Sequence, residues 1–121
     1  MVRFRLSRLA EADLAYILAT SEERWGPEVR RRYAALLAAA MRKAAGDPEG
    51  PTTRDRGRLS PGLRSFHARH ARHDDPKAKV KQPVHVLYYR AVASDLIEIV
   101  RVLHERVEPT LHIGAGLEGN D

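Results

Sequence analysis

The stretch DLIEIVRVLHERVEP, from Asp95 to Pro109, decides how this chain folds. An antiparallel strand usually alternates apolar and polar residues, because one face meets the core and the other meets water. In this stretch apolar side chains fall on both faces, and Arg101 stands between Val100 and Val102. A strand of this kind has a second apolar face, which some other part of the protein or a partner must cover.

Length and composition indicate one folded domain. The chain has 121 residues, of which 43% are hydrophobic and 31% charged, and this balance is typical of a globular protein. It contains no cysteine, which excludes disulfides and thiolate metal sites. Its first residues do not resemble a signal peptide, and no apolar run reaches the roughly 20 residues that cross a bilayer. We expect a cytoplasmic protein that needs no cofactor or metal.

The N-terminal half predicts a strand followed by a helical hairpin. VRFRL, residues 2–6, alternates apolar and basic residues, as a half-buried strand does. Ser7 is suited to cap a first helix, and Gly26-Pro27 ends that helix and begins a second one, which stops at Gly46. The expected apolar stripe of the first helix comprises Ala10, Leu14, Ile17, Leu18, Ser21 and Trp25. That of the second comprises Val29, Tyr33, Leu36, Leu37, Ala40 and Ala44.

The C-terminal half predicts a three-stranded antiparallel meander. Its strands are expected at 63–70, 84–92 and 96–104, after a loop over 46–62. A polar connection over 71–83 joins the first two strands. The whole is an α+β fold, with the helical hairpin packed on an antiparallel sheet in two layers. We expect this domain to span residues 1–113, followed by a flexible Gly-rich tail at 114–121.

The helical hairpin covers one face of such a sheet, and little of the chain remains for the other. An unsatisfied apolar face suggests a protein partner. The alternative is that curvature of the sheet, together with the C-terminal segment, hides these residues internally.

Five stretches of the chain, taken together, point to a known family. They are FRLSRLAEADLAYI (4–17), RWGPEVRRRYAALL (24–37), GLRSFHARH (62–70), VLYYRA (86–91) and IEIVRVLHERVEP (97–109). In these stretches the chain resembles ParE-type toxins of the RelE/ParE superfamily, the toxic halves of type II toxin–antitoxin pairs. The stretches cover most of the chain and follow the family's order, although the segment 71–83 is longer than in many relatives.

The resemblance implies a bacterial, non-enzymatic toxin that inhibits DNA gyrase and is held inactive in a hetero-oligomer with a ParD-like antitoxin. The antitoxin's acidic C-terminal segment would fold as it wraps the toxin. The charge distribution is compatible with such a partner. Residues 54–81 contain nine basic and three acidic residues, a net charge of +6, whereas the rest of the chain sums to −1.

The same superfamily includes ribosome-dependent mRNA endonucleases of the RelE type, so an RNase is the alternative. RNA cleavage needs a base, an acid and cations around the phosphate, and no carboxylate is obviously placed as the base. We favour instead a cross-strand pair between Arg90 and Glu98. The spacing of His67, His70 and His73 disfavours a metal site, because on a strand the middle side chain points to the opposite face.

Arg101 is the residue most in need of explanation. Alternation places it on one face with Ile97, Ile99 and Leu103, and Glu98 on the other. A buried guanidinium needs a carboxylate, from this chain or from a partner, and acids are few in the sheet region. We therefore expect Arg101 to help form the surface that meets antitoxin or target. The complete expected surface is Arg90, Arg101, His104, Arg106, Lys77, Lys79 and Lys81.

Overall fold

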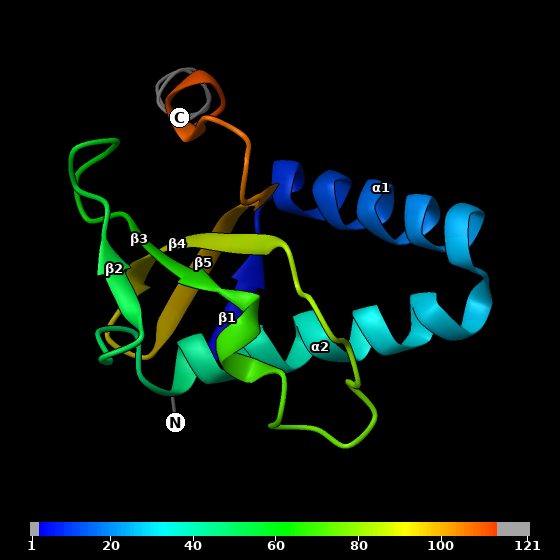
Figure 1. Ribbon diagram of the computed structural model, residues 1–121. Coiled ribbons are helices and arrows are strands. Elements are labelled where there is room, and N and C mark those ends of the chain that lie inside the picture. The colour runs from blue at the N-terminus through cyan, green and yellow to red at the C-terminus, as the bar shows by residue number, and fades with distance from the viewer. Residues whose placement is uncertain (1–2, 114–121) are drawn as a thin grey trace.

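The computed structural model describes residues 3–113, which form two layers, a helical hairpin and a five-stranded sheet (Figure 1). The sheet has the order β1-β5-β4-β3-β2, in which β1 is parallel to β5 and the other neighbours are antiparallel. The predicted α+β fold is confirmed. Along the chain the elements are β1 (Arg3–Leu6), α1 (Arg8–Trp25), α2 (Pro27–Gly46), β2 (Thr53–Asp55), β3 (Arg64–His67), η1 (Ala68–Ala71), β4 (His85–Ala93), β5 (Leu96–His104) and η2 (Pro109–Leu111).

The sheet has one strand more than predicted. β2 lies within the expected loop and pairs with β3, so that Thr53 stands opposite Phe66. Three residues are too few to show an alternating pattern, which is why the sequence does not reveal this strand. β3 is also shorter than predicted, because the 3-10 helix η1 begins at Ala68. The expected tail at 114–121 lies outside the described residues.

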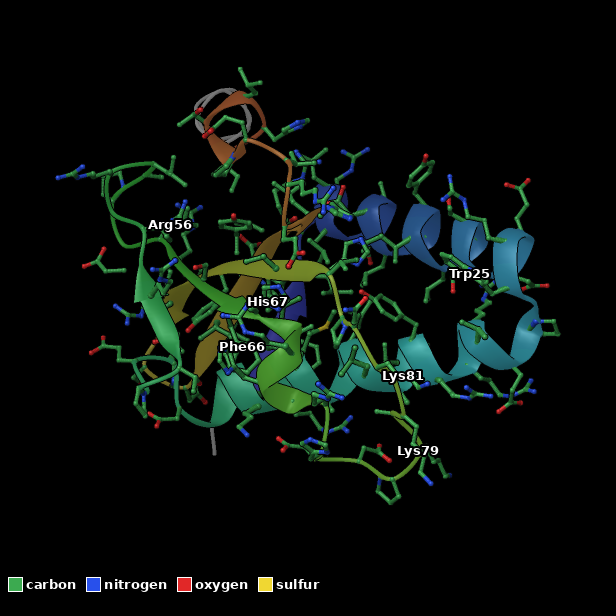
Figure 2. All side chains as sticks on the ribbon, in the orientation of Figure 1. Trp25, Arg56, Phe66, His67, Lys79 and Lys81 are labelled. Atoms are coloured by element: carbon green, nitrogen blue, oxygen red, sulfur yellow. The ribbon has the colours of Figure 1, made fainter. Side chains whose placement is uncertain are left out.

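The two helices form as expected. The Ser7 hydroxyl accepts a hydrogen bond from Ala10 N–H and caps α1. Gly26, at φ +92°, is the single residue between the helices, and Pro27 begins α2. Trp25 was expected on the buried stripe, but its side chain is 63% exposed. It lies at the tip of the hairpin, beyond the sheet (Figure 2), so no core is available to it there.

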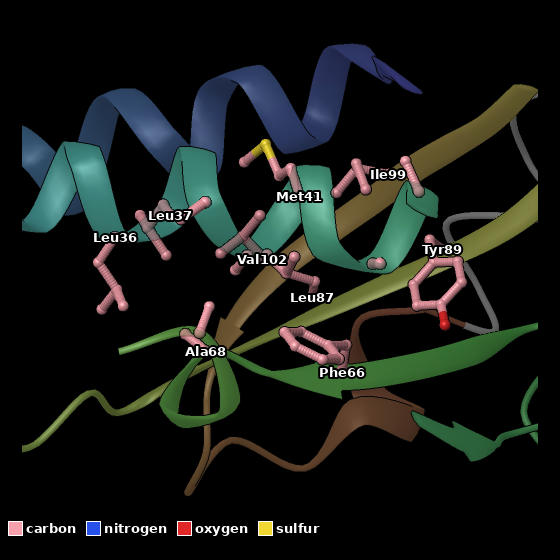
Figure 3. Close-up of a cluster of buried hydrophobic side chains, with 14 of the residues drawn as sticks. Leu36, Leu37, Met41, Phe66, Ala68, Leu87, Tyr89, Ile99 and Val102 are labelled. Atoms are coloured by element: carbon pink, nitrogen blue, oxygen red, sulfur yellow. The ribbon is translucent and has the colours of Figure 1, made fainter. Parts of the chain in front are cut away.

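The main core lies between α2 and the sheet (Figure 3). α2 contributes its apolar face almost completely, whereas the buried residues of α1 are Ala10 and Ser21. Leu14, Ile17 and Leu18 of α1 are only partly buried against this core. The fully buried large side chains that meet between α2 and the sheet are Leu36, Leu37, Phe66, Leu87, Tyr89, Ile97, Ile99 and Val102.

The second face of the sheet is covered by the chain itself. Val100 and Leu103 are only 3% and 7% exposed. They pack in a second cluster with Leu63, Tyr88 and Ile113, against which Leu59, Val86 and Val107 are partly buried. The loop before β3 and the C-terminal segment supply this cover. The expectation that a partner covers these side chains is therefore wrong, and the internal alternative holds.

Truncation of Leu87 tests the main core. Leu87 is fully buried, and Leu87→Ala is expected to lower the free energy of unfolding by roughly 2–5 kcal/mol through lost apolar burial and the cavity left behind. Urea denaturation measures this change. The matched control is Leu111→Ala, since the Leu111 side chain is 75% exposed. Similar losses in both variants would contradict this description of the core.

Candidate partner-binding surface

The structure divides the seven predicted surface residues among separate places. Arg90 lies near the turn of the β4–β5 hairpin, opposite Glu98. His104 ends β5 at the other end of the same hairpin, and Arg106 follows it. The three lysines lie in the segment between η1 and β4. Of these, Lys79 and Lys81 line a pocket together with residues of α2 (Figure 2). Arg101 is apart from all of them, in the middle of β5.

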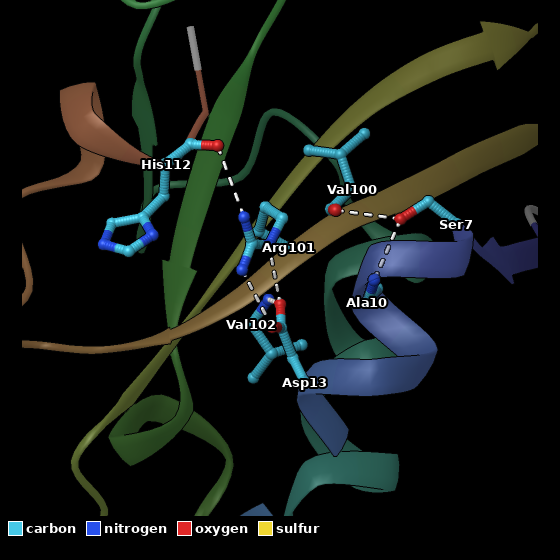
Figure 4. Close-up of polar contacts among 7 residues, drawn as sticks. All are labelled: Ser7, Ala10, Asp13, Val100, Arg101, Val102 and His112. Carbon is cyan, nitrogen blue, oxygen red and sulfur yellow. Dashed lines mark hydrogen bonds and ion pairs between the residues drawn. The ribbon is translucent and has the colours of Figure 1, made fainter. Parts of the chain in front are cut away.

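Arg101 forms an internal ion pair with Asp13 of α1 (Figure 4). Its Nε and Nη2 donate to the two carboxylate oxygens at 2.8 and 2.9 Å, and its Nη1 donates to the carbonyl of His112 at 3.3 Å. The Arg101 and Asp13 side chains are only 16% and 14% exposed. The hydrogen bonds to Asp13 raise the pKa of Arg101 above its ordinary value.

The prediction that placed Arg101 on a partner surface is thereby corrected. The carboxylate that pairs with Arg101 is that of Asp13 in α1, a helix that lies far from β5 in the sequence. The face of Arg101 was also predicted wrongly, because the register shifts between Tyr88 and Tyr89, whose partners are Arg101 and Ile99. Val100 is the extra residue of this β-bulge. Arg101 therefore shares the face of Tyr88 and Glu98, and not the face of Ile99.

Arg90 and Glu98 are register partners, as the sequence predicted. The ion pair to Glu98, however, comes from Arg5 of β1 at 3.3 Å. Within residues 3–113 the buried Nε atom of Arg90 has no hydrogen-bond partner. Arg90 thus occupies the expected place in the sheet without the expected ion pair.

A cluster of titratable side chains at the end of the sheet was not predicted. Tyr33 Oη lies 2.5 Å from His85 Nδ1, and His67 Nε2 lies 2.6 Å from Glu105 Oε1. The rings of His85 and His104 meet edge to face at 5.6 Å. The hydrogen bond with His67 lowers the pKa of Glu105. Burial, and then the nearby positive charge of His104, lower the pKa of His85 to about 4.

The register of the β4–β5 hairpin brings two histidines of this cluster together, and the sequence does not reveal that register. His85 and His104 are the first and last residues of two adjacent antiparallel strands and stand opposite each other in the register. The predicted hairpin, with Arg90 opposite Glu98, places Leu103 opposite His85 when its register is continued without a bulge. Among the described residues, no group of three or more His, Asp or Glu side chains is arranged to hold a metal ion.

A basic pocket lies between α2 and the segment 72–81. Its volume is about 590 Å³. Two of the predicted lysines, Lys79 and Lys81, line it, whereas Lys77 does not. The other lining residues, which the sequence pattern does not connect with them, are Val29, Arg32, Tyr33, Arg72, His73 and Val80.

Comparison with known proteins identifies the family. Residues 4–109 match the profile described as "ParE toxin of type II toxin-antitoxin system, parDE". The chain belongs to the ParE toxin family. It is 34% identical to Toxin ParE1 of Caulobacter vibrioides, over 94% of this chain and 100% of the relative. Identity is 31% with Toxin ParE1 of Mycobacterium tuberculosis, over 88% and 92%, and 31% with Toxin ParE of Escherichia coli, over 98% and 100%.

The family match confirms the resemblance based on the five stretches. A ParE toxin of a parDE system implies a cognate antitoxin as partner. The described helices include none that is long and apolar enough to cross a membrane.

Removal of the Arg101 guanidinium tests its structural role in this ParE toxin. Arg101→Ala leaves the largely buried Asp13 carboxylate without its counter-charge, so the free energy of unfolding is expected to fall by roughly 2–4 kcal/mol. Thermal or urea denaturation measures the loss. The control is Arg31→Ala, which removes an ion pair whose two side chains are 71% and 60% exposed and should change stability little. An Arg101 variant as stable as the control would contradict the structural role.

His85 predicts a pH-dependent stability. In the fold its pKa is lowered from 6.5 to about 4, so between these values the unfolded chain binds a proton that the folded protein does not. The free energy of unfolding is therefore expected to fall as the pH drops through this window, by roughly 2–3 kcal/mol at the low end. His85→Gln should flatten this dependence, and the control His112→Gln, at an exposed position, should not. Denaturation curves at several pH values measure this dependence. If the free energy of unfolding changes equally with pH in all three proteins, its attribution to His85 is wrong.

Proposed function

We propose that this protein is a toxin that inhibits DNA gyrase by binding and is neutralised by a cognate antitoxin with an acidic segment. The observation that carries the proposal is the extent of the family match. It runs from within β1 to the start of η2 and so includes both layers of the fold. The relatives named Toxin ParE or ParE1 align over nearly their whole length.

The arrangement of charged groups supports a binding role. Arg101 is held by Asp13, and Arg90 and His104 lie at opposite ends of one hairpin. The cations that were considered for RNA cleavage therefore do not converge on one point. Lys79 and Lys81 do converge with Arg32 and Arg72, in a pocket that can receive the acidic groups of a partner.

An mRNA endonuclease of the RelE type is the alternative, and one observation favours it. His67, His85, His104 and Glu105 lie together, and histidines in such a cluster can act as general acid and base. Against this role, His85 is neutral at physiological pH and Tyr33 already occupies its Nδ1 atom. Phosphate-binding cations would have to come from Arg106 and neighbouring basic residues.

A supercoiling assay tests the proposal. Purified toxin is expected to block the supercoiling of relaxed plasmid by gyrase, and the antitoxin encoded by the neighbouring reading frame is expected to restore it. Relaxation of the supercoiled form of this plasmid by topoisomerase I is the control for non-specific binding to DNA, and it should be unaffected.

Unchanged supercoiling at excess folded toxin would rule out the gyrase target. The alternative, cleavage of mRNA, is measured separately by primer extension on messages translated in vitro. Toxin-dependent cleavage within ribosome-bound messages, with supercoiling intact, would establish the endonuclease in its place.

A further inference from the structure

We propose that a row of charged side chains on the second face of the sheet binds the phosphate backbone of duplex DNA without reading its sequence. This arginine row consists of Arg56, Arg90, Glu98 and Arg5, in spatial order. The inference goes beyond the proposed inhibition of gyrase, because it is a direct contact between the toxin and DNA that requires no enzyme.

The register of the sheet aligns these residues across the strands. Arg5 of β1 stands opposite Glu98 of β5, and Glu98 stands opposite Arg90 of β4. The N–H of Arg56 donates to the carbonyl of Leu63 at 2.8 Å. The register of β3 and β4, continued by one residue, places Leu63 opposite Arg90. Since neighbouring strands lie about 4.8 Å apart, the arginine row is roughly 19 Å long.

The side chains of the row all lie on the second face. Alternation puts Arg90 on the face of Tyr88, which belongs to the second cluster. The sequence neighbours of Arg5 and of Glu98 pack in or against the main core, so these two side chains point the same way. The guanidinium carbon of Arg56 lies 5.8 Å from the centroid of the Tyr88 ring. The row therefore forms one continuous strip of charge.

The chain neutralises this charge only in part. Glu98 is the one carboxylate of the row, and it contacts Arg5 at 3.3 Å. Arg56 and Arg90 form no ion pair with any residue of the range 3–113. Three arginines and one glutamate give the row a net charge of +2. An anion is attracted to such a strip.

Arg54 of β2 extends the positive charge beyond the row. It stands opposite Ser65, which stands opposite Tyr88, so its side chain points to the same face. It forms no ion pair within the described part of the chain. Asp55, the next residue, accepts a hydrogen bond from Gly57 N–H at 2.7 Å and so serves the turn that follows β2.

Two arginines of the row are held in position before an anion binds. Arg56 lies over the ring of Tyr88, beside the β2–β3 loop (Figure 2), in a cation–π contact that leaves its N–H groups free to donate. The Nε atom of Arg90 is buried and has no hydrogen-bond partner among the described residues. A guanidinium that is partly removed from water and has no counter-charge is stabilised by an anion. Its paired N–H groups match two oxygens of one phosphate.

Duplex DNA fits the arginine row better than a peptide or a single strand does. Leu63, the apolar residue within the row, is fully buried, so the row lacks the apolar contact that protein interfaces use at their centre. Single strands bind through aromatic side chains on which bases stack, and Tyr88 is only 5% exposed and lies under Arg56. Backbone phosphates need only charge and donors. Over roughly 19 Å, each strand of a duplex carries about six of them.

The test is a titration of a fluorescently labelled DNA duplex with the purified toxin at several salt concentrations. The logarithm of the association constant is expected to fall linearly with the logarithm of the salt concentration. In Arg56→Gln/Arg90→Gln the slope should be less steep by about 2, and binding at low salt roughly tenfold weaker, because two phosphate contacts are lost. Dissociation constants of sequence-independent binding are about 10⁻⁴–10⁻⁶ M at physiological salt, so topoisomerase I stays unaffected at lower toxin concentrations.

The matched control is Arg24→Gln/Arg69→Gln, which removes the same charge at two exposed positions outside the row. It should bind DNA with the slope of the unmodified protein. Circular dichroism verifies that each variant is folded. If Arg90→Gln prevents folding, the single variant Arg56→Gln replaces the double variant, and its slope should differ by about 1.

Three outcomes would overturn the proposal. They are the absence of duplex binding to the unmodified protein at low salt, an equal loss in the control, and tighter binding of a labelled oligothymidylate or polyglutamate than of the duplex. The titration contains no gyrase. Duplex binding that depends on Arg56 and Arg90, in a preparation that leaves supercoiling unchanged, would therefore support the arginine row and refute only the gyrase target.

Discussion

The carboxylate of Asp13 connects parts of the structure that otherwise have little in common. β1 ends at Leu6 and pairs only with the first half of β5, so beyond Ile99 the edge of β5 has backbone groups without a neighbouring strand. The start of α1 supplies their partners. The Ser7 hydroxyl donates to Val100 C=O at 2.8 Å, and Asp13 accepts from Val102 N–H at 2.9 Å. Leaving such groups unpaired would cost about 1–3 kcal/mol each.

Because Asp13 is largely buried, it requires a counter-charge, and Arg101 provides it from the same strand. Arg101 in turn reaches the carbonyl of His112, just before Ile113, which is fully buried in the second cluster. One carboxylate and one guanidinium thus link α1, the edge of β5 and the C-terminal segment that covers the second face (Figure 4). The attachment of α1 to β5 and the position of the C-terminal cover therefore share the Arg101 guanidinium.

The sequence predicted the elements of the fold more reliably than their faces. Apolar spacing and the pair Gly26-Pro27 located both helices, since these signals are local. The face of Arg101 and the neighbours of His85 depend instead on bulges in the β4–β5 hairpin, at Val100 and near Val92. A bulge reverses the alternation beyond it, and no residue type marks it in advance. Asp13 could be assigned to a helix from the sequence, but its contact with β5 depends on how the two layers pack.

The self-covered second face changes what a partner of this toxin can recognise. A large exposed apolar face would favour association of many kinds. Instead, the apolar side chains of the second face, such as Val100 and Leu103, are buried within the chain. At the basic pocket the charge comes chiefly from Arg and Lys side chains. Next to it, Tyr33 joins the pocket wall to His85, whose pKa of about 4 keeps that histidine neutral. Acidification through the pKa of His85 therefore weakens the fold beside this pocket, because the neutral imidazole that Tyr33 contacts must then take up a proton.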